Sequence, residues 1–308
     1  MSVASFIDRV MAESAYLPEP GLEASVAELT ERDRAEVLAL LAERPIHTVG
    51  MAGLIRDNGV VSPHHRGTFY GCRNSEGRLE GVALVGHHTL VEARTRRALR
   101  EFALVAQGCA RTHMIMGEVE AVDEFWNAYA DEGRTMRRVC REVLFELRRP
   151  ALAGLSQLMV EPCRGEGLRP AEPADVDLIA PVHAALAEAE SGVNPLDFDP
   201  QGFIRRCLRR IEQGRTWVVV EGGRLVFKAD VQADTPEVVY VEGVYVHPQE
   251  RGTTLGRRYM SQLCRRLLAR TRVLCLLANE ENERAQRFYR VCGFKARAVY
   301  DTIYLSRD

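Results

Sequence analysis

One stretch of the chain, residues 238–268, combines a strand, a glycine-containing loop and a helix in direct succession. Val238 to Val246 is rich in valine and tyrosine, which favour a strand. Pro248 ends this strand, because proline has no N–H to donate to a ladder. From Leu255 to Leu268 the leucines recur on one helical face, and most of the arginines lie off that face. This succession predicts an α/β domain.

The loop between this strand and this helix, Arg251 to Gly256, has the features of an anion site. The first N–H groups of a helix have no intrahelical partner, and the helix dipole favours negative charge there. Gly252 and Gly256 allow a ligand to approach the backbone, because glycine has no Cβ. The loop contains neither G-x-G-x-x-G nor G-x-x-x-x-G-K-[ST]. Taken alone, it is equally well interpreted as an ordinary strand-to-helix turn.

Two motifs carry a family resemblance. The loop resembles the pyrophosphate loop of the GNAT superfamily of acyl-CoA-dependent N-acetyltransferases, with Thr254 where a glycine is commonest. Its matching residues are Val246, Pro248, Arg251, Gly252 and Gly256. The second GNAT signature, Asn-x-x-Ala-x-x-Phe/Leu-Tyr-x-x-x-Gly-Phe, is matched at every spacing by Asn282, Ala285, Phe288, Tyr289, Gly293 and Phe294. Gly293 is also suited to ending a helix. The order of the two motifs resembles that of a GNAT domain.

Composition limits the class of protein and its partners. The 308 residues suffice for two ordinary domains, and 46% hydrophobic with 27% charged residues is a globular composition. A formal net charge of −2 gives no overall reason to expect nucleic acid or an anionic membrane as a partner. The sequence has no apolar run long enough to span a bilayer and no signal-peptide pattern. Arginine pairs such as Arg205-Arg206 and Arg209-Arg210 are interpreted as solvated helix faces.

The eight cysteines stand singly, without a C-x-x-C pair. This pattern favours a reducing, cytoplasmic location and small buried side chains rather than a disulfide framework. The adjacent histidine pairs, His64-His65 and His87-His88, complete no ligand set. We therefore expect no metal site.

The two halves of the chain have the same predicted element order, α-α-β-β-β-α-β-α-β. In the first half we expect helices at 33–41, 49–56, 95–107 and 119–131, and strands at 68–72, 79–85, 89–91, 112–116 and 139–147. In the second half we expect helices at 174–190, 201–213, 255–268 and before Gly293, and strands at 216–221, 224–231, 238–246, 273–277 and 299–305. The predicted fold is α/β, with an α+β mixed sheet, as two tandem GNAT-like domains.

The expected division of the chain follows from this repeat. It comprises a helical segment at 1–20, a degenerate GNAT-like domain at 21–149, a Pro- and Gly-containing linker at 150–167 and a catalytic GNAT domain at 168–308. The first domain is expected to be inactive, because residues 93–99, at its loop position, contain no glycine. The arrangement resembles bacterial tandem GNAT proteins with an N-terminal domain of unknown function, some of which are protein lysine acetyltransferases. The resemblance includes Asn194-Pro195 and the stretch from Glu242 to Pro248, although Gln is the residue expected at 242.

Acyl transfer to an amine needs groups that move protons. A lysine-like amine, with a pKa of ~10.4, is neutral in only roughly one molecule in a thousand at neutral pH, so a general base helps. Glu242, four residues before Val246, is the candidate base, and a structural carboxylate paired with an arginine is the alternative. The family implies that a backbone N–H near Val246 stabilises the carbonyl oxygen. It also implies that Tyr289 protonates the departing thiolate, with an aromatic that merely packs its helix as the alternative.

The resemblance implies acetyl-CoA as the cofactor. The residues expected to bind it are Val244, Val246, Arg251, Gly252, Thr253, Thr254, Leu255, Gly256, Arg257, Asn282, Ala285 and Tyr289. The expected activity is that of an acetyl-CoA-dependent N-acetyltransferase acting on a primary amine such as a protein lysine. The alternatives are a catalytically silent acyl-CoA-binding sensor or scaffold and a small-molecule amine acetyltransferase.

The acceptor side is expected at residues 184–200, which hold four carboxylates and no basic residue: Glu188, Glu190, Asp197 and Asp199. Without a local counter-charge these carboxylates would attract a cationic amine, and Glu188 and Glu190 are the expected substrate residues. An ordinary acidic helix end and loop is the alternative interpretation.

Overall fold

The computed structural model describes residues 25–149 and 167–306, so the helix expected at 1–20 and nearly all of the expected linker lie outside the described residues. The contacts divide the chain into two units. The first unit comprises the described residues up to Leu144 together with those from Arg297 onward, and the second comprises the described residues between Phe145 and Ala296. None of the described helices is both long and apolar enough to cross a membrane.

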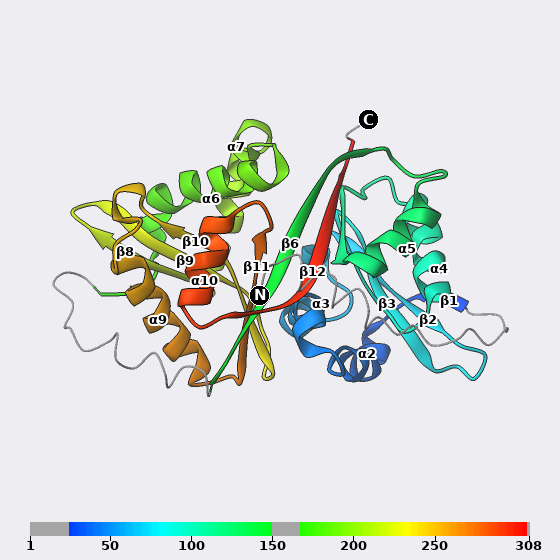
Figure 1. Cartoon of the computed structure of the whole chain (residues 1–308). Coiled ribbons are helices and arrows are strands. Elements are labelled where there is room, and N and C mark those ends of the chain that lie inside the picture. Colours follow the sequence, from blue (N-terminus) through cyan, green and yellow to red (C-terminus); the bar gives the residue numbers. More distant parts are fainter. Residues whose placement is uncertain (1–24, 150–166, 307–308) are drawn as a thin grey trace. The chain divides into compact units, whose positions relative to one another are not determined.

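The first unit is a sheet with helices on both faces (Figure 1). Its strands follow the order β1-β2-β3-β4-β5-β12-β6. Its elements are β1 (Ser25–Glu28), α2 (Arg34–Leu41), α3 (Pro45–Asn58), β2 (Gly67–Arg73), β3 (Leu79–Gly86), β4 (His88–Ala93), α4 (Arg96–Gln107), β5 (Met114–Glu118), α5 (Val119–Tyr129), β6 (Met136–Arg148) and most of β12 (Lys295–Leu305). The helices and strands expected in this half are all present, and β1 was not expected.

The side chains of β3 point alternately to the two faces of the sheet, and both faces are apolar. Val82 and Leu84 belong to one core cluster, with residues of α2 and α3. Ala83 and Val85 belong to the other, with residues of α4 and α5. Successive side chains of a strand point to opposite faces, so a strand that is buried on both faces reads as a continuous apolar run.

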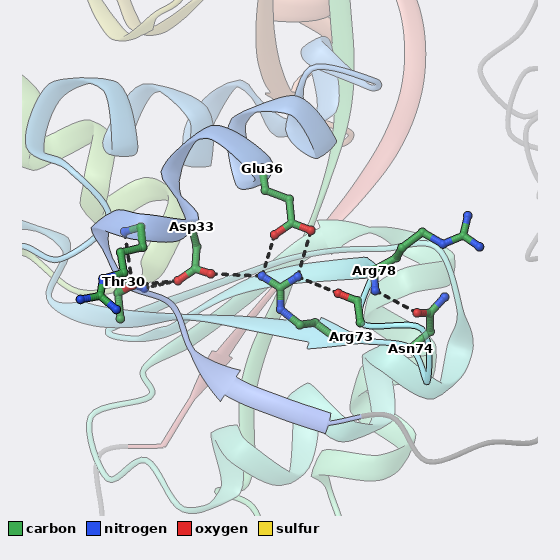
Figure 2. A network of polar contacts seen from close by, with 8 residues as sticks. Thr30, Asp33, Glu36, Arg73, Asn74 and Arg78 are labelled. Carbon is green, nitrogen blue, oxygen red and sulfur yellow. Dashed lines mark hydrogen bonds and ion pairs between the residues drawn. The ribbon is translucent and has the colours of Figure 1, made fainter.

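Arg73, at the end of β2, joins the helical layer to the β2–β3 turn (Figure 2). Its guanidinium donates to Glu36 of α2 at 2.6 and 2.9 Å, to Asp33 at 3.1 Å and to the Gly77 carbonyl at 2.9 Å. A planar guanidinium with several donors suits such a multiple contact. The network is a structural tie between α2 and the hairpin.

The second unit repeats the same order of elements. Its strands follow the order β6-β11-β10-β9-β8-β7, with α9 and α10 in front of the strands in Figure 1. Its elements are β7 (Arg169–Pro170), α6 (Val176–Ser191), α7 (Pro195–Phe198), α8 (Pro200–Glu212), β8 (Thr216–Glu221), β9 (Arg224–Asp234), β10 (Val238–Val246), α9 (Leu255–Leu268), β11 (Val273–Asn279) and α10 (Glu283–Val291). The short elements β7 and α7 were not expected.

The last strand, β12, belongs mainly to the first unit. It pairs antiparallel with β5 from Tyr300↔Glu118 to Tyr304↔Met114. Ile303 lies in the core of the first unit, and Asp301 accepts two hydrogen bonds from Arg141, each 2.8 Å long. The contact units therefore differ from the sequence ranges 21–149 and 168–308, because the strand expected to close the second domain pairs within the first unit.

Candidate active site

Strand β10 is not paired with its neighbour β11 along more than half of its length. The two strands pair in parallel only from Val238↔Val273 to Tyr240↔Cys275, although β10 continues to Val246 and β11 to Asn279. Val244 and Val246 are only partly buried although they are apolar. We call these unpaired ends of β10 and β11 the strand opening. It leaves an edge of β10 available to a ligand.

A β-bulge lies in β10 beside the strand opening. The register against β9 shifts between Glu242↔Asp230 and Tyr245↔Lys228, so Gly243 and Val244 face no regular partner. Gly243 has φ +56°, and a Cβ there would lie 2.9 Å from both Asp230 Oδ2 and Lys228 Nζ. Only glycine fits this position without strain.

The bulge rests on two buried charges of β9. The side chains of Lys228 and Asp230 are 0% and 1% exposed and form an ion pair. Lys228 Nζ also donates to the Gly243 carbonyl at 3.2 Å. A buried charge is tolerated when it is paired and hydrogen-bonded, so this pair holds the bulge in place.

Asp230 is the centre of a polar cluster, which we call the Asp230 cluster: His183, Arg210, Thr216, Lys228, Asp230 and Glu242. Its carboxylate accepts from Thr216 Oγ1 at 2.8 Å and from Arg210 at 3.3 Å, and it lies 3.3 Å from His183 Nδ1. Burial alone would raise the pKa of Asp230, but Lys228, His183 and Arg210 together lower it well below its ordinary value. The carboxylate is therefore ionised near neutral pH.

Glu242 is paired with an arginine in this cluster. Its carboxylate lies 2.8 Å from Arg210 Nη1, and Arg210 also donates to Gln232 at 2.9 Å. Burial would lower the pKa of Arg210, but the carboxylates of Glu242 and Asp230 raise it, so the guanidinium keeps its charge. Glu242 thus has the geometry of the alternative interpretation, a structural carboxylate paired with an arginine.

The structure corrects the interpretation of one arginine. Arg210 was expected on a solvated helix face, but its side chain is only 23% exposed and is bonded to two carboxylates. Helical spacing places it beside Phe203, Cys207 and Ile211, the buried residues of α8. The spacing of Arg210 from these apolar residues is the sequence signal that could have predicted a partly buried, paired arginine.

The loop after β10 is fixed by its own side chains. Arg251 Nε donates to the Val246 carbonyl at 2.9 Å, so this guanidinium is turned toward the backbone. Thr253 Oγ1 donates to the Glu250 carbonyl at 2.8 Å and accepts from the Leu255 amide at 3.2 Å. These bonds order the loop before any ligand binds.

The start of α9 leaves backbone donors free. Thr254 precedes the helix without a side-chain capping bond, and its carbonyl accepts from the Arg258 amide at 3.0 Å. Within the two described ranges, the amides of Gly256 and Arg257 have no hydrogen-bond partner. Free amides at a helix start suit a pyrophosphate group.

The two loop glycines differ in what surrounds them. Gly252 has φ +83°, and a Cβ there would meet no atom within 4 Å, so its surroundings are open. A Cβ at Gly256 would lie 2.9 Å from Val246 and 3.5 Å from Phe288 of α10. The residues present therefore fit a phosphate-bearing cofactor.

The second signature has clear structural roles in α10. Asn282 caps the helix, because its Oδ1 accepts from the Ala285 amide at 3.0 Å. Gly293 follows the helix with φ +89°, as expected of a terminating glycine. The cap and the glycine fix where α10 begins and ends.

Tyr289 of α10 is 7% exposed among aromatic side chains. Its ring lies 6.0 Å from Phe145, 5.5 Å from Phe288 and 6.0 Å from Phe294, between centroids. Burial raises the pKa of Tyr289, and electrostatic interactions with Cys292 and Glu190 raise it further. The phenol is protonated at neutral pH, and its hydroxyl has no hydrogen-bond partner in the described part of the chain.

One carboxylate of the expected acidic acceptor stretch has a basic partner. Asp199 accepts from the Gly202 amide at 2.8 Å and pairs with Arg206 at 3.2 Å, so that expectation is wrong for this residue. The Gly202 amide and Arg206 lower the pKa of Asp199. Glu188 accepts from the Asn194 side chain at 3.0 Å, and both Glu188 and Glu190 are exposed.

The equivalent place in the first unit is occupied by side chains. Strands β4 and β5 pair only from His88↔Met114 to Leu90↔Met116. Beyond that point Arg44 bridges Glu92 of β4 and Glu118 of β5. The helix after β4 is also capped, since Thr95 Oγ1 accepts from the Ala98 amide at 3.2 Å. In the first unit, therefore, side chains bridge the separated strand ends and a side chain caps the helix start.

Known proteins resemble the chain in sequence and in fold. Residues 183–294 match the sequence profile of the acetyltransferase (GNAT) family. The GNAT resemblance is confirmed. No curated protein matches the chain.

Solved structures of other proteins resemble the chain over nearly its whole length. A tandem GNAT protein from the clavulanic acid biosynthesis pathway has a TM-score of 0.60 at 15% identity, covering 93% of this chain and 100% of that one. A Drosophila protein has a TM-score of 0.63 at 11% identity, covering 92% and 98%. A GCN5-related N-acetyltransferase from Sphaerobacter thermophilus has a TM-score of 0.55 at 14% identity, covering 91% and 94%. The likeness confirms the fold of two tandem GNAT-like domains.

Proposed function

We propose that the protein is an acetyl-CoA-dependent N-acetyltransferase that acetylates a primary amine at one site, in the second unit. The observation that carries this proposal is the strand opening beside the uncapped start of α9. The opening offers an edge for a pantetheine chain, and the free amides of Gly256 and Arg257 offer donors to a pyrophosphate. Acetyl-CoA, when bound, supplies the acetyl group as a reactive thioester.

The residues of the chain bind and move protons in this proposal. A backbone N–H near Val246, on the unpaired edge of β10, donates to the carbonyl oxygen as charge develops there. Tyr289 holds a proton at its hydroxyl for the leaving sulfur, and its raised pKa keeps that proton in place. Asn282 and Ala285 set the start of α10 and thereby orient Tyr289.

We also propose a reducing, cytoplasmic location. Seven cysteines among the described residues are free thiols, and most of them are buried. Burial raises the pKa of the Cys292 thiol to about 12, so this group is a poor nucleophile near neutral pH. Free thiols of this kind are typical of proteins in reducing compartments.

One CoA is expected to bind per chain, and Gly252→Ala is expected to weaken binding by about tenfold or more, or ~1.4 kcal/mol. The added methyl would occupy the open space at Gly252 where a pyrophosphate approaches the backbone. Gly223→Ala is the matched control, because Gly223 also has a positive φ (+73°) and open surroundings but lies in the β8–β9 turn. Isothermal titration with CoA measures both the stoichiometry and the affinity.

A stoichiometry near two would contradict the single site. Equal weakening by the two alanine substitutions would show that backbone strain rather than ligand contact is responsible. CoA binding without transfer to any of a broad panel of amines would instead favour a silent acyl-CoA sensor.

We propose a cationic acceptor such as a lysine side chain, supported by the exposed carboxylates of Glu188 and Glu190. Lysine-bearing peptides are expected to react faster than acidic amino acids, and Glu188→Gln with Glu190→Gln should lower their kcat/KM several-fold. The rate should fall with salt, because the Debye length shortens from about 10 Å at 0.1 M to about 3 Å at 1 M. Asp177→Asn, at the other end of α6, is the control. Faster reaction of acidic amino acids, or rates independent of salt, would contradict the proposal.

A further inference from the structure

We infer that His183 accepts the proton of the incoming amine and that Asp230 positions its ring, a role that rests on the proposed function. His183 lies in the middle of α6, and its Nδ1 faces the Asp230 carboxylate at 3.3 Å. A histidine beside a buried carboxylate is a common arrangement for a general base. Sequence reasoning gave neither residue a role.

The carboxylate selects one tautomer of the ring. Asp230 is ionised and 1% exposed, and Thr216 and Lys228 hold it in place. An ionised carboxylate accepts hydrogen bonds only, so a neutral His183 must carry its proton on Nδ1. Nε2 then has a lone pair and can take up a proton.

The side chain of His183 is partly accessible, and its Nε2 is not hydrogen-bonded to any described residue. The side chain is 22% exposed, and no residue of the described ranges forms a hydrogen bond with Nε2. Phe203 packs edge-on against the ring at 5.4 Å between centroids, which limits its rotation. A ring that is held on one side and open on the other suits proton transfer with a bound amine.

The dyad lies next to the bulge that borders the strand opening. Asp230 stands opposite Glu242 in the β9–β10 register, and its Oδ2 lies 2.9 Å from the position of a Cβ at Gly243. His183 is therefore separated from the bulge by a single carboxylate. An amine that approaches the bulge from the side of α6 would therefore meet His183.

The surrounding charges favour His183 over Glu242 as the base. Glu242 is engaged by Arg210 at 2.8 Å, whereas Nε2 of His183 is not engaged. The groups that face the dyad are Lys228 of β9, Glu242 of β10, and Arg210 and Cys207 of α8. The positive charges of Lys228 and Arg210 are balanced by the carboxylates of Asp230 and Glu242. Asp230 is the carboxylate that lies next to His183, and it stabilises the imidazolium that forms.

The proton balance of the reaction is complete with these groups. One ammonium proton passes to His183 Nε2 and then to water. The amine nitrogen bonds to the acetyl carbon as the carbon–sulfur bond breaks, and Tyr289 gives the sulfur its proton. A second proton leaves the nitrogen after the new bond has formed and restores the Tyr289 hydroxyl through water.

The tautomer can be measured on the ligand-free protein. Long-range proton–nitrogen NMR spectra distinguish a protonated ring nitrogen from a bare one, and His183→Gln assigns the signal. We expect the neutral ring of His183 to carry its proton on Nδ1, the less common tautomer of free histidine. A proton on Nε2 of the neutral ring would overturn the inference without bearing on acetyl-CoA binding.

Kinetics provide the second test. His183→Gln should lower kcat/KM for the amine by about a hundredfold or more and remove the part of the expected rise of rate with pH that depends on this base. Imidazole should restore part of the rate to His183→Ala. His64→Gln, on the surface of the first unit, is the control for the same substitution. CoA affinity should be unchanged in all variants.

The outcomes separate the inference from the function on which it rests. If wild type transfers acetyl groups and Glu242→Gln, not His183→Gln, removes the pH-dependent rise, the inference is overturned and the proposed function stands. If wild type transfers to no amine, both are overturned.

Discussion

Asp230→Asn lowers the free energy of unfolding of the second unit by about 3–5 kcal/mol, the usual cost of leaving a buried charge without its partner. The substitution leaves the 0% exposed Lys228 without its carboxylate partner, and Arg210 keeps only Glu242, 2.8 Å away, as a counter-charge. Denaturant unfolding of the full chain measures the change. Asp234→Asn is the matched control, since Asp234 lies on the same strand and pairs with Arg270 at the surface. An exposed ion pair contributes about 0–1 kcal/mol.

The difference in unfolding free energy between wild type and Asp230→Asn should decrease only as the pH falls. Asp230 has a lowered pKa in the folded protein, so its stabilisation is fully present above its ordinary value of 3.8. It is lost as the pH falls through the folded-state pKa. The difference between wild type and Asp230→Asn should therefore be constant from pH 8 to pH 5 and shrink only in strong acid. Equal effects of Asp230→Asn and Asp234→Asn, or a difference that grows on acidification, would contradict the role assigned to the buried pair.

The local sequence pattern was sufficient to predict the strand and the helix on either side of the loop from Arg251 to Gly256. Val238–Val246 and Leu255–Leu268 have the bounds that the sequence predicted, because proline ends the strand and leucine spacing defines the helix. Gly293 ends α10 at the expected place. These features depend on residues within one or two turns of each other, and a sequence displays them directly.

The Asp230 cluster could not be predicted in this way. Its members come from α6, α8, β8, β9 and β10, and they meet only after β9 and β10 have paired with a bulge at Gly243. A lysine in the run Leu225 to Ala229 looks like an interruption of a buried strand until its carboxylate partner, two residues on, is known to be buried with it. His183 likewise has no visible role until Asp230 lies 3.3 Å away.

Strand pairing also decided the division into units. The pattern of residues 299–305 predicts a strand but not its partner, and β12 pairs with β5, far away in sequence. Ile303 and Leu305 then contribute to a core whose other buried residues lie in the first half of the chain. Partner choice between strands depends on non-local contacts, which local patterns do not encode.

Tyr289→Phe is expected to lower kcat by about a hundredfold, within the ~10²–10⁴ that a positioned proton donor contributes. The substitution removes only the hydroxyl, so the ring contacts with Phe145, Phe288 and Phe294 are kept. The affinity for CoA should change little, because Tyr289 lies outside the loop that we propose to bind the pyrophosphate. Stopped-flow or steady-state release of free CoA thiol measures the rate.

Tyr259→Phe is the control that separates a proton donor from a buried hydroxyl. Tyr259 is 2% exposed in the same unit, and its hydroxyl donates to Glu221 at 3.1 Å. Its substitution should affect stability by about 1 kcal/mol and leave kcat nearly unchanged. If both substitutions lower kcat equally, Tyr289 acts through packing alone. If Tyr289→Phe leaves kcat unchanged while transfer continues, the leaving sulfur takes its proton from water, because the hydroxyl has no other partner in the described residues through which it could act.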